Sequence, residues 1–136
     1  MPLLDPQAGV IAFEDGFCLT PYMPASALSE RYAALRNRDV FLDAHPAAGG
    51  SLAPICFFQE GTLVSVTLYV HEAAGAERPA AGRQRALLLR SLRLKDPCPD
   101  TQGSLRVRFP FGEVFVSTDP HTGQAAALIR YASRCG

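Results

Sequence analysis

Two runs of alternating residues meet at a tight turn in the middle of the chain. Leu52–Gln59 and Thr62–His71 flank Glu60-Gly61, a dipeptide typical of a β-hairpin because glycine readily takes a positive φ. The apolar positions of the second run, which we expect in the core, are Val64, Val66, Leu68 and Val70. The positions that alternate with them are Ser65, Thr67, Tyr69 and His71. This pattern predicts a strand with one face in the core and an open, polar-aromatic face.

Further strands are predicted by short apolar runs with turn residues between them. Near the start of the chain, Val10–Glu14 and Phe17–Thr20 flank Asp15-Gly16, again a hairpin signature. Two shorter segments are interpreted as a strand at Asp39–Asp43 and a loop at His45–Gly50. The last three predicted strands, which form a meander, are Leu105–Phe109, Glu113–Asp119 and Gln124–Ala132. Because hairpins join antiparallel neighbours, these turns exclude a doubly wound parallel sheet.

Two segments have the period of an amphipathic helix. In Pro24–Arg36 the side chains Leu28, Tyr32 and Leu35 fall on one face, and proline suits a first helical turn. In Arg83–Leu94 the residues expected on the apolar side are Leu87, Leu88, Leu92 and Leu94, and those expected outside are Arg83, Arg85, Arg90 and Arg93. We therefore predict an α+β fold in which residues 1–136 form a single domain. It is mainly an antiparallel β-sheet with two α-helices packed on one face.

Composition excludes several classes of protein. The chain has 136 residues, of which 48% are hydrophobic and 19% charged, as in a folded domain and unlike a disordered segment. We find neither the roughly 18 consecutive apolar residues of a membrane span nor a signal peptide, so we expect a cytoplasmic protein with no membrane partner. The four cysteines stand far apart, without a CxxC pair or a close histidine, which is unlike a zinc site.

The charges are unevenly distributed along the chain although their sum is zero. Up to Glu77 there are nine acidic and three basic residues, and from Arg78 onward there are four acidic and ten basic ones. A nucleic-acid-binding domain is usually basic overall, with aromatic residues among its lysines and arginines. Here the aromatic residues stand in apolar runs. We therefore expect no direct contact with nucleic acid, and a molecule with an acidic and a basic side.

The sequence carries none of the local motifs of the common enzyme classes: no P-loop, nucleophile elbow, dinucleotide-binding glycine run, HExxH or EF-hand loop. Three histidines, His45, His71 and His121, could meet in the fold as metal ligands or as a base beside Asp119. Their simpler interpretation is a loop, a strand end and a turn, since the segment from Asp119 to Gly123 is typical of a β-turn. We therefore predict no catalytic residue, no metal ligand and no cofactor.

Part of the sequence resembles a known group of proteins. The stretch from Phe111 to Tyr131 (FGEVFVSTDPHTGQAAALIRY), with the earlier strand Gly61–Tyr69 (GTLVSVTLY), is similar to small bacterial proteins encoded beside secreted toxins. Those proteins end in a similar Gly-x-Val strand, Asp-Pro-x-x-Gly turn and Ile-x-Tyr strand. They are taken to be immunity proteins of type VI secretion or related polymorphic toxin systems. The resemblance covers mainly the last third of the chain and transfers no binding residue.

The resemblance implies a protein that binds and occludes a cognate toxin. Because we find no signal peptide, we expect that toxin to act in the cytosol, for example as a nuclease or a nucleotide-targeting effector. We expect the acidic part of the chain to meet a basic face of the toxin, and tyrosine to contribute contact area at little entropic cost. The expected partner-binding residues are Asp43, Glu60, Tyr69, His71 and Glu72.

Other functions stay open at this point. One alternative is a non-catalytic adaptor that binds through the helix arginines Arg83, Arg90 and Arg93, and another is a small-ligand-binding domain with a pocket between helices and sheet. A third is a small hydrolase that uses His71, His121 and Asp119. Self-association as a homodimer stays open as well.

Overall fold

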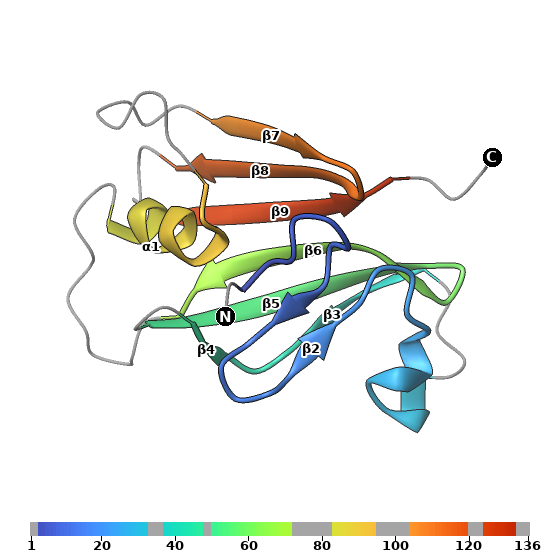
Figure 1. Ribbon diagram of the computed structural model, residues 1–136. Helices are drawn as coiled ribbons and strands as arrows, with labels where there is room; N and C mark the ends of the chain where they lie inside the picture. The colour runs from blue at the N-terminus through green and yellow to red at the C-terminus, as the bar shows by residue number, and fades with distance from the viewer. Residues whose placement is uncertain are drawn as a thin grey trace.

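Antiparallel strands make up most of the structure (Figure 1). The computed structural model describes residues 3–32, 37–47, 50–71, 83–94, 104–119 and 124–132. The strands are β1 (Ile11–Ala12), β2 (Cys18–Leu19), β3 (Arg38–Phe41), β4 (His45–Ala47), β5 (Gly50–Gln59), β6 (Thr62–Val70), β7 (Leu105–Phe109), β8 (Gly112–Thr118) and β9 (Ala125–Tyr131). Within the described ranges there is one α-helix, α1 (Arg83–Leu92).

Seven of the strands form one sheet in the order β3-β5-β6-β9-β8-β7, and β4 pairs with the start of β5. The hairpin β5–β6 and the meander β7–β8–β9 are each built from consecutive strands, as their turn residues predict. The two groups meet where Ser65–Tyr69 of β6 pairs with Ala126–Arg130 of β9. Strands β1 and β2 form a separate small hairpin.

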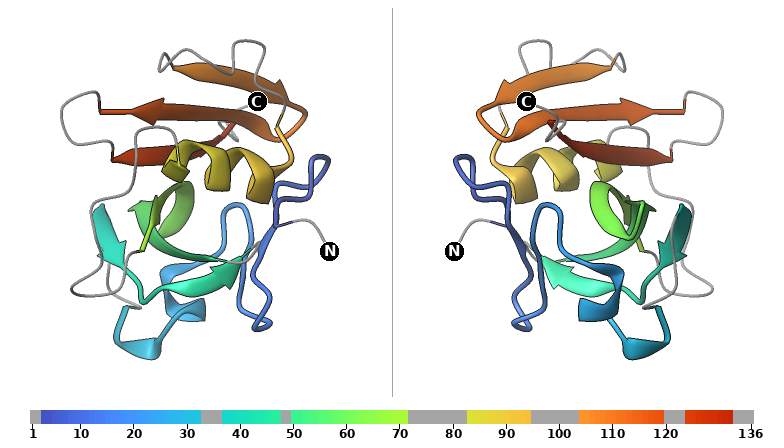
Figure 2. Two further views of the ribbon diagram at one scale, coloured as in Figure 1. Left: turned by 90° about the vertical axis from the view of Figure 1, so that its left-hand side faces the viewer. Right: turned by 90° about the vertical axis from the view of Figure 1, so that its right-hand side faces the viewer.

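The core lies on one face of this sheet, beneath α1 and the N-terminal hairpin. Figures 1 and 2 show both of these elements on the same side of the sheet. Helix α1 contacts β6, β8 and β9 and buries Leu88 and Leu92, while the hairpin region contributes Ile11, Phe13 and Leu19. The sheet residues buried completely on this side include Leu52, Cys56, Phe58, Leu63, Val66, Leu68, Val114, Val116, Ala127 and Ile129. We call the opposite side of the sheet the outer face.

The prediction of two helices on one face of an α+β fold is wrong. The segment predicted to form the first helix begins instead with two 3-10 turns, Ala25–Ala27 and Glu30–Tyr32, and residues 33–36 lie outside the described ranges. Pro24 forms a β-bridge with Thr62, and the Ala25 amide donates a hydrogen bond of 2.9 Å to the Gly61 carbonyl. Backbone pairing with β6 therefore overrides a helical propensity that two serines already weaken.

The predicted alternation in β6 holds only after Val64. Val66 and Leu68 are completely buried, and Val70 is partly buried against the core, as expected. Before them, however, the register with β5 shifts: Phe57 pairs with Ser65, and Phe58 pairs with Leu63. Val64 is thus the extra residue of a β-bulge, which places Leu63 in the core and leaves Val64 partly exposed.

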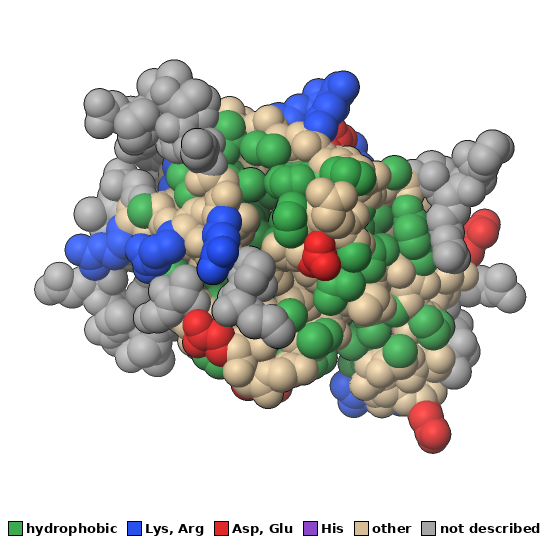
Figure 3. All heavy atoms as spheres, in the orientation of Figure 1, with side chains coloured by type: hydrophobic (Ala, Val, Ile, Leu, Met, Phe, Trp, Pro, Cys, Tyr) green, Lys and Arg blue, Asp and Glu red, His purple; other side chains and the backbone are tan. Residues whose placement is uncertain are grey.

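Helix α1 confirms the second predicted helix, but one of the arginines predicted on its exposed side is buried. Arg85, which we expected outside, is 5% exposed, and Gln84 is buried beside it. The Gln84 side-chain oxygen accepts a hydrogen bond of 2.8 Å from the Ala125 amide, so the start of the helix fixes the start of β9. Arg83, Arg90 and Arg93 are exposed, and Figure 3 shows basic side chains gathered at α1 on the side of the molecule that the helix covers.

No helix in the described part of the chain is long and apolar enough to cross a membrane.

The turns explain where the strands end. Glu60 and Gly61 have φ values of 52° and 81°, so the β5–β6 hairpin has positive φ at both central residues. The Glu60 amide donates a 2.9 Å hydrogen bond to Asn37 Oδ1.

The predicted loop at His45–Gly50 is wrong, because His45–Ala47 pairs with Gly50–Leu52 as β4.

The bulge gives a direct test of this fold. Leu63→Asp places an unpaired carboxylate in the core and is expected to lower the free energy of unfolding by more than about 3 kcal/mol. Val64→Asp, the matched control, keeps its charge at the partly exposed position and is expected to cost less than about 1 kcal/mol. Urea denaturation followed by circular dichroism measures both. A larger loss of unfolding free energy for Val64→Asp than for Leu63→Asp would show that Val64 lies in the core, as in a regular strand, and would contradict the bulge.

Candidate functional site

The residues predicted to bind a partner do not form one cluster. Glu60 lies in the turn that begins β6, whereas Tyr69 and His71 lie at the other end of this strand. A strand rises by about 3.3 Å per residue, so the two ends of β6 lie roughly 25 Å apart. Asp43 is exposed in the segment between β3 and β4, and Glu72 lies outside the described residues. Binding by any of these residues stays a prediction.

Tyr69 and Asp119 share a shallow hollow at the far end of the sheet. Its volume is about 520 Å³, and its other lining residues are Ser117, Thr118, Gln124 and Ala126. The hollow thus brings together one residue of the predicted binding set and one of the predicted hydrolase set. Of the other two members of that second set, His71 does not line the hollow, and His121 lies outside the described residues.

The outer face carries two rows of side chains that cross the whole sheet. The strand registers align the first row as Asp39, Phe57, Ser65, Arg130, Glu113 and Arg108. They align the second row as Phe41, Ile55, Thr67, Leu128, Phe115 and Arg106. Phe41 is 74% exposed and Phe57 is 36% exposed. Two phenylalanine side chains exposed near each other on neighbouring strands are a feature typical of a recognition site.

An arginine-aromatic cluster occupies the β7–β9 end of these rows. The guanidinium carbons of Arg106 and Arg130 lie 5.2 Å and 5.5 Å from the centre of the Phe115 ring. Arg106 Nε also donates a 2.8 Å hydrogen bond to Glu113 Oε2, and Arg106 Nη2 forms an ion pair with the same oxygen at 2.7 Å. Arg130 Nη1 lies 3.7 Å from Glu113 Oε1. The ring and the carboxylate therefore hold both guanidinium groups in place at the surface.

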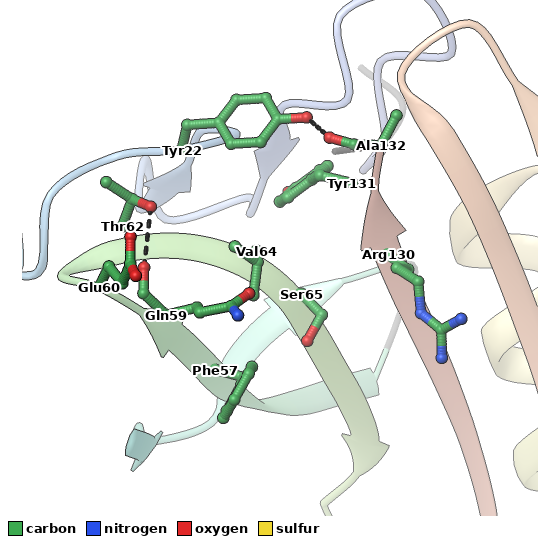
Figure 4. A pocket seen from close by; sticks show the side chains of 10 residues that line it. All are labelled: Tyr22, Phe57, Gln59, Glu60, Thr62, Val64, Ser65, Arg130, Tyr131 and Ala132. Atoms are coloured by element: carbon green, nitrogen blue, oxygen red, sulfur yellow. Dashed lines mark hydrogen bonds between the residues drawn. The ribbon is translucent and has the colours of Figure 1, made fainter. Parts of the chain in front are cut away.

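A larger hollow lies where β6 and β9 part (Figure 4). Its volume is about 700 Å³, and its lining includes Phe57, Glu60, Val64, Ser65 and Arg130. Strand β9 pairs with β6 only from Ser65 onward, and segment 22–24 lies beside the earlier residues of β6. The Tyr22 amide donates a hydrogen bond to the Leu63 carbonyl, and the Leu63 amide donates one to the Met23 carbonyl, both at 2.9 Å. The Tyr22 hydroxyl donates to the Ala132 carbonyl and bridges the gap (Figure 4).

A histidine–carboxylate pair fastens the N-terminal hairpin to the sheet. His45 Nδ1 of β4 lies 2.6 Å from Asp15 Oδ2 in the turn between β1 and β2. The His45 ring stacks on Phe17, with centroids 4.3 Å apart, and it also contacts Phe13. The hydrogen bond with His45, followed by the one from the Phe17 amide, lowers the pKa of Asp15. Sequence analysis treated these two segments separately and missed the pair.

Two buried groups, the Cys56 thiol and the Tyr131 phenol, have surroundings that oppose ionisation. Burial raises the pKa of the Cys56 thiol to about 12, and it also raises the pKa of the Tyr131 phenol. The Tyr131 hydroxyl donates a 3.0 Å hydrogen bond to the Gly9 carbonyl, which is a structural role. Within the described ranges, no group of three or more His, Cys, Asp or Glu residues could hold a metal ion.

Sequence analysis missed most of the outer-face residues, although local signals for some of them were present. Arg106 and Arg108 alternate with apolar residues in β7, which places both on one face. The proximity of Arg130 and Phe57 depends on β6–β9 pairing, which local turn residues do not reveal. Comparisons with models of known protein families, with curated proteins and with solved structures found no match.

The His45–Asp15 pair predicts a pH-dependent contribution to stability. Because folding lowers the pKa of Asp15 from its usual 3.8, the contribution is present above that value and is lost as the pH falls through the folded-state pKa. Asp15→Asn should therefore lower the thermal midpoint near pH 7 and have little effect near pH 2. Asp39→Asn on β3 is the exposed control. Differential scanning calorimetry measures the midpoints, and an equal loss for Asp15→Asn at both pH values would contradict the stabilising role of the charge.

Proposed function

We propose that this chain is a protein-binding domain without a reaction of its own, and that it acts as a bacterial immunity protein that occludes a cognate secreted toxin. The outer face carries this proposal. Phe41, which is 74% exposed, and Phe57, which is 36% exposed, lie on neighbouring strands beside Ile55. Across Thr67 of β6, the same face carries Leu128 and Phe115.

The chemistry of this face favours a protein as its partner. Aromatic residues and arginine are enriched at protein interfaces, where a few such side chains account for most of the binding energy. Here both kinds stand on paired strands, so their backbone positions are already fixed before binding. A rigid surface loses little conformational entropy in a complex, which suits a protein that must block a toxin tightly.

The resemblance to immunity proteins also supports the outer face as the binding surface. The similar residues, Phe111–Tyr131 and Gly61–Tyr69, include β8, β9 and most of β6. These three strands supply the middle of both rows, including Thr67, Leu128 and Phe115. The part of the sequence that suggests an immunity protein therefore builds the middle and one end of the proposed binding face, and Phe41 and Phe57 stand beside it on β3 and β5.

Co-purification with the product of a toxin-like gene, sought beside the gene for this chain, tests the proposal. We expect a stoichiometric complex that survives gel filtration, with Phe41→Glu and Phe57→Glu each weakening it by at least about thirtyfold, as for central interface anchors. Arg93→Glu on α1 is the matched control for an added negative charge. Isothermal titration calorimetry gives the affinities, and circular dichroism verifies that each variant is folded.

The alternatives predict different outcomes. An adaptor that uses the helix would lose its complex through Arg83→Glu or Arg93→Glu and keep it through Phe41→Glu. A hydrolase would lose protection of toxin-expressing cells through His71→Ala or Asp119→Asn without losing any complex. Either pattern would overturn occlusion by the outer face. The predicted contributions of Asp43, Glu60 and Tyr69 are measured in the same assay with alanine variants.

A further inference from the structure

The charges on the outer face differ between its two edges. Arg106 and Arg108 of β7 and Arg130 of β9 lie toward one edge, with Glu113 as the carboxylate that bridges two of them. Asp39 stands at the other edge, on β3. The three arginines and one glutamate leave a net positive charge on the part of the outer face formed by β7, β8 and β9. This charge complements an acidic partner and not a basic one.

The geometry of the arginines suits carboxylate recognition. Arg106 and Arg130 are 51% and 58% exposed, whereas the side chain of Glu113 between them is 17% exposed. Stacking on Phe115 and pairing with Glu113 restrain the two guanidinium groups, so they lose little freedom when another group binds. The N–H groups on their solvent side are donors that a carboxylate accepts in a bidentate arrangement.

Arg130 also lines the hollow between β6 and β9, so the cluster and the hollow are continuous. Figure 4 shows Arg130 on one side of the hollow, Phe57 and Val64 along it, and Glu60 toward the opposite side. An apolar side chain that enters beside Phe57 and Val64 therefore has a positive neighbour on one side and a negative neighbour on the other.

We infer that the outer face binds a protein segment in which an aromatic or aliphatic side chain is flanked on one side by carboxylates. The apolar side chain enters the hollow, and the carboxylates lie against Arg106 and Arg130. This inference rests on the proposed function and names the chemistry of its partner, which is the reverse of the basic surface expected from the sequence. A nucleic acid fits less well, because Asp39 and Glu60, which lie away from the arginines, oppose a chain of phosphates that continues past the arginine cluster.

Three defined probes distinguish these partners in titrations of the isotope-labelled chain followed by NMR. The probes are the peptide Asp-Glu-Asp-Phe-Leu, the peptide Lys-Arg-Lys-Phe-Leu and a short oligothymidylate. We expect the acidic peptide to bind at least about tenfold more tightly than the other two at low salt, and its affinity to fall as salt is added. The largest shifts should occur at Phe57, Val64, Phe115 and Arg130.

Charge-changing variants complete the test. Arg130→Gln and Arg108→Glu should each weaken binding of the acidic peptide several-fold, and Arg93→Glu on α1 should not. Two variants at separate positions keep the test valid if one of them fails to fold. Tighter binding of the basic peptide or the oligonucleotide, or shifts that map to α1, would overturn the inference.

The two proposals fail in different ways. A toxin complex that forms while the acidic peptide shows no preference for the outer face would overturn the inferred partner chemistry and leave the immunity function standing. A preference for the acidic peptide without any toxin complex would support the inferred chemistry and refute the immunity function.

Discussion

The pairing of β6 with β9 is the contact on which the rest of the sheet depends. Each strand belongs to a group built by local turns, and the two groups are far apart in sequence. Where Ser65–Tyr69 meets Ala126–Arg130, the side chains of both groups come into register. Helix α1 lies over this junction and contacts β6, β8 and β9. The same pairing thus creates the core beneath the helix and the continuous rows on the outer face.

The larger hollow arises because this pairing is incomplete. The extra residue at Val64 changes the register of β6 just before β9 pairs with it, and segment 22–24 takes over the edge that β9 leaves. A regular strand would have placed Val64 in the core and Leu63 outside. The bulge therefore moves one apolar side chain to the outer face, where it lines a hollow in an otherwise paired sheet.

Local patterns predicted most of the strands and turns, but missed β4, which pairs with the residues that follow it, and failed where distant contacts decide. The Glu60-Gly61 and Asp15-Gly16 hairpins and the open face of Thr67 and Tyr69 follow from short-range chemistry, and the structure confirms them. The first predicted helix fails because segment 22–25 bonds to residues 61–63, which no local window contains. For the same reason the sequence could indicate an open face but not that Phe57, Arg130 and Phe115 would lie near one another on it.

Strand β7 stands at an edge of the sheet, and this position gives its arginines a second consequence. An edge strand presents backbone groups to which a strand of another chain can add, and charged side chains deter such addition. In the sheet order that the structure describes, β7 has β8 on one side, and Arg106 and Arg108 alternate along it. Like charges on two such edges repel each other. Arg106 and Arg108 therefore disfavour pairing of β7 with β7 of a second copy of the chain.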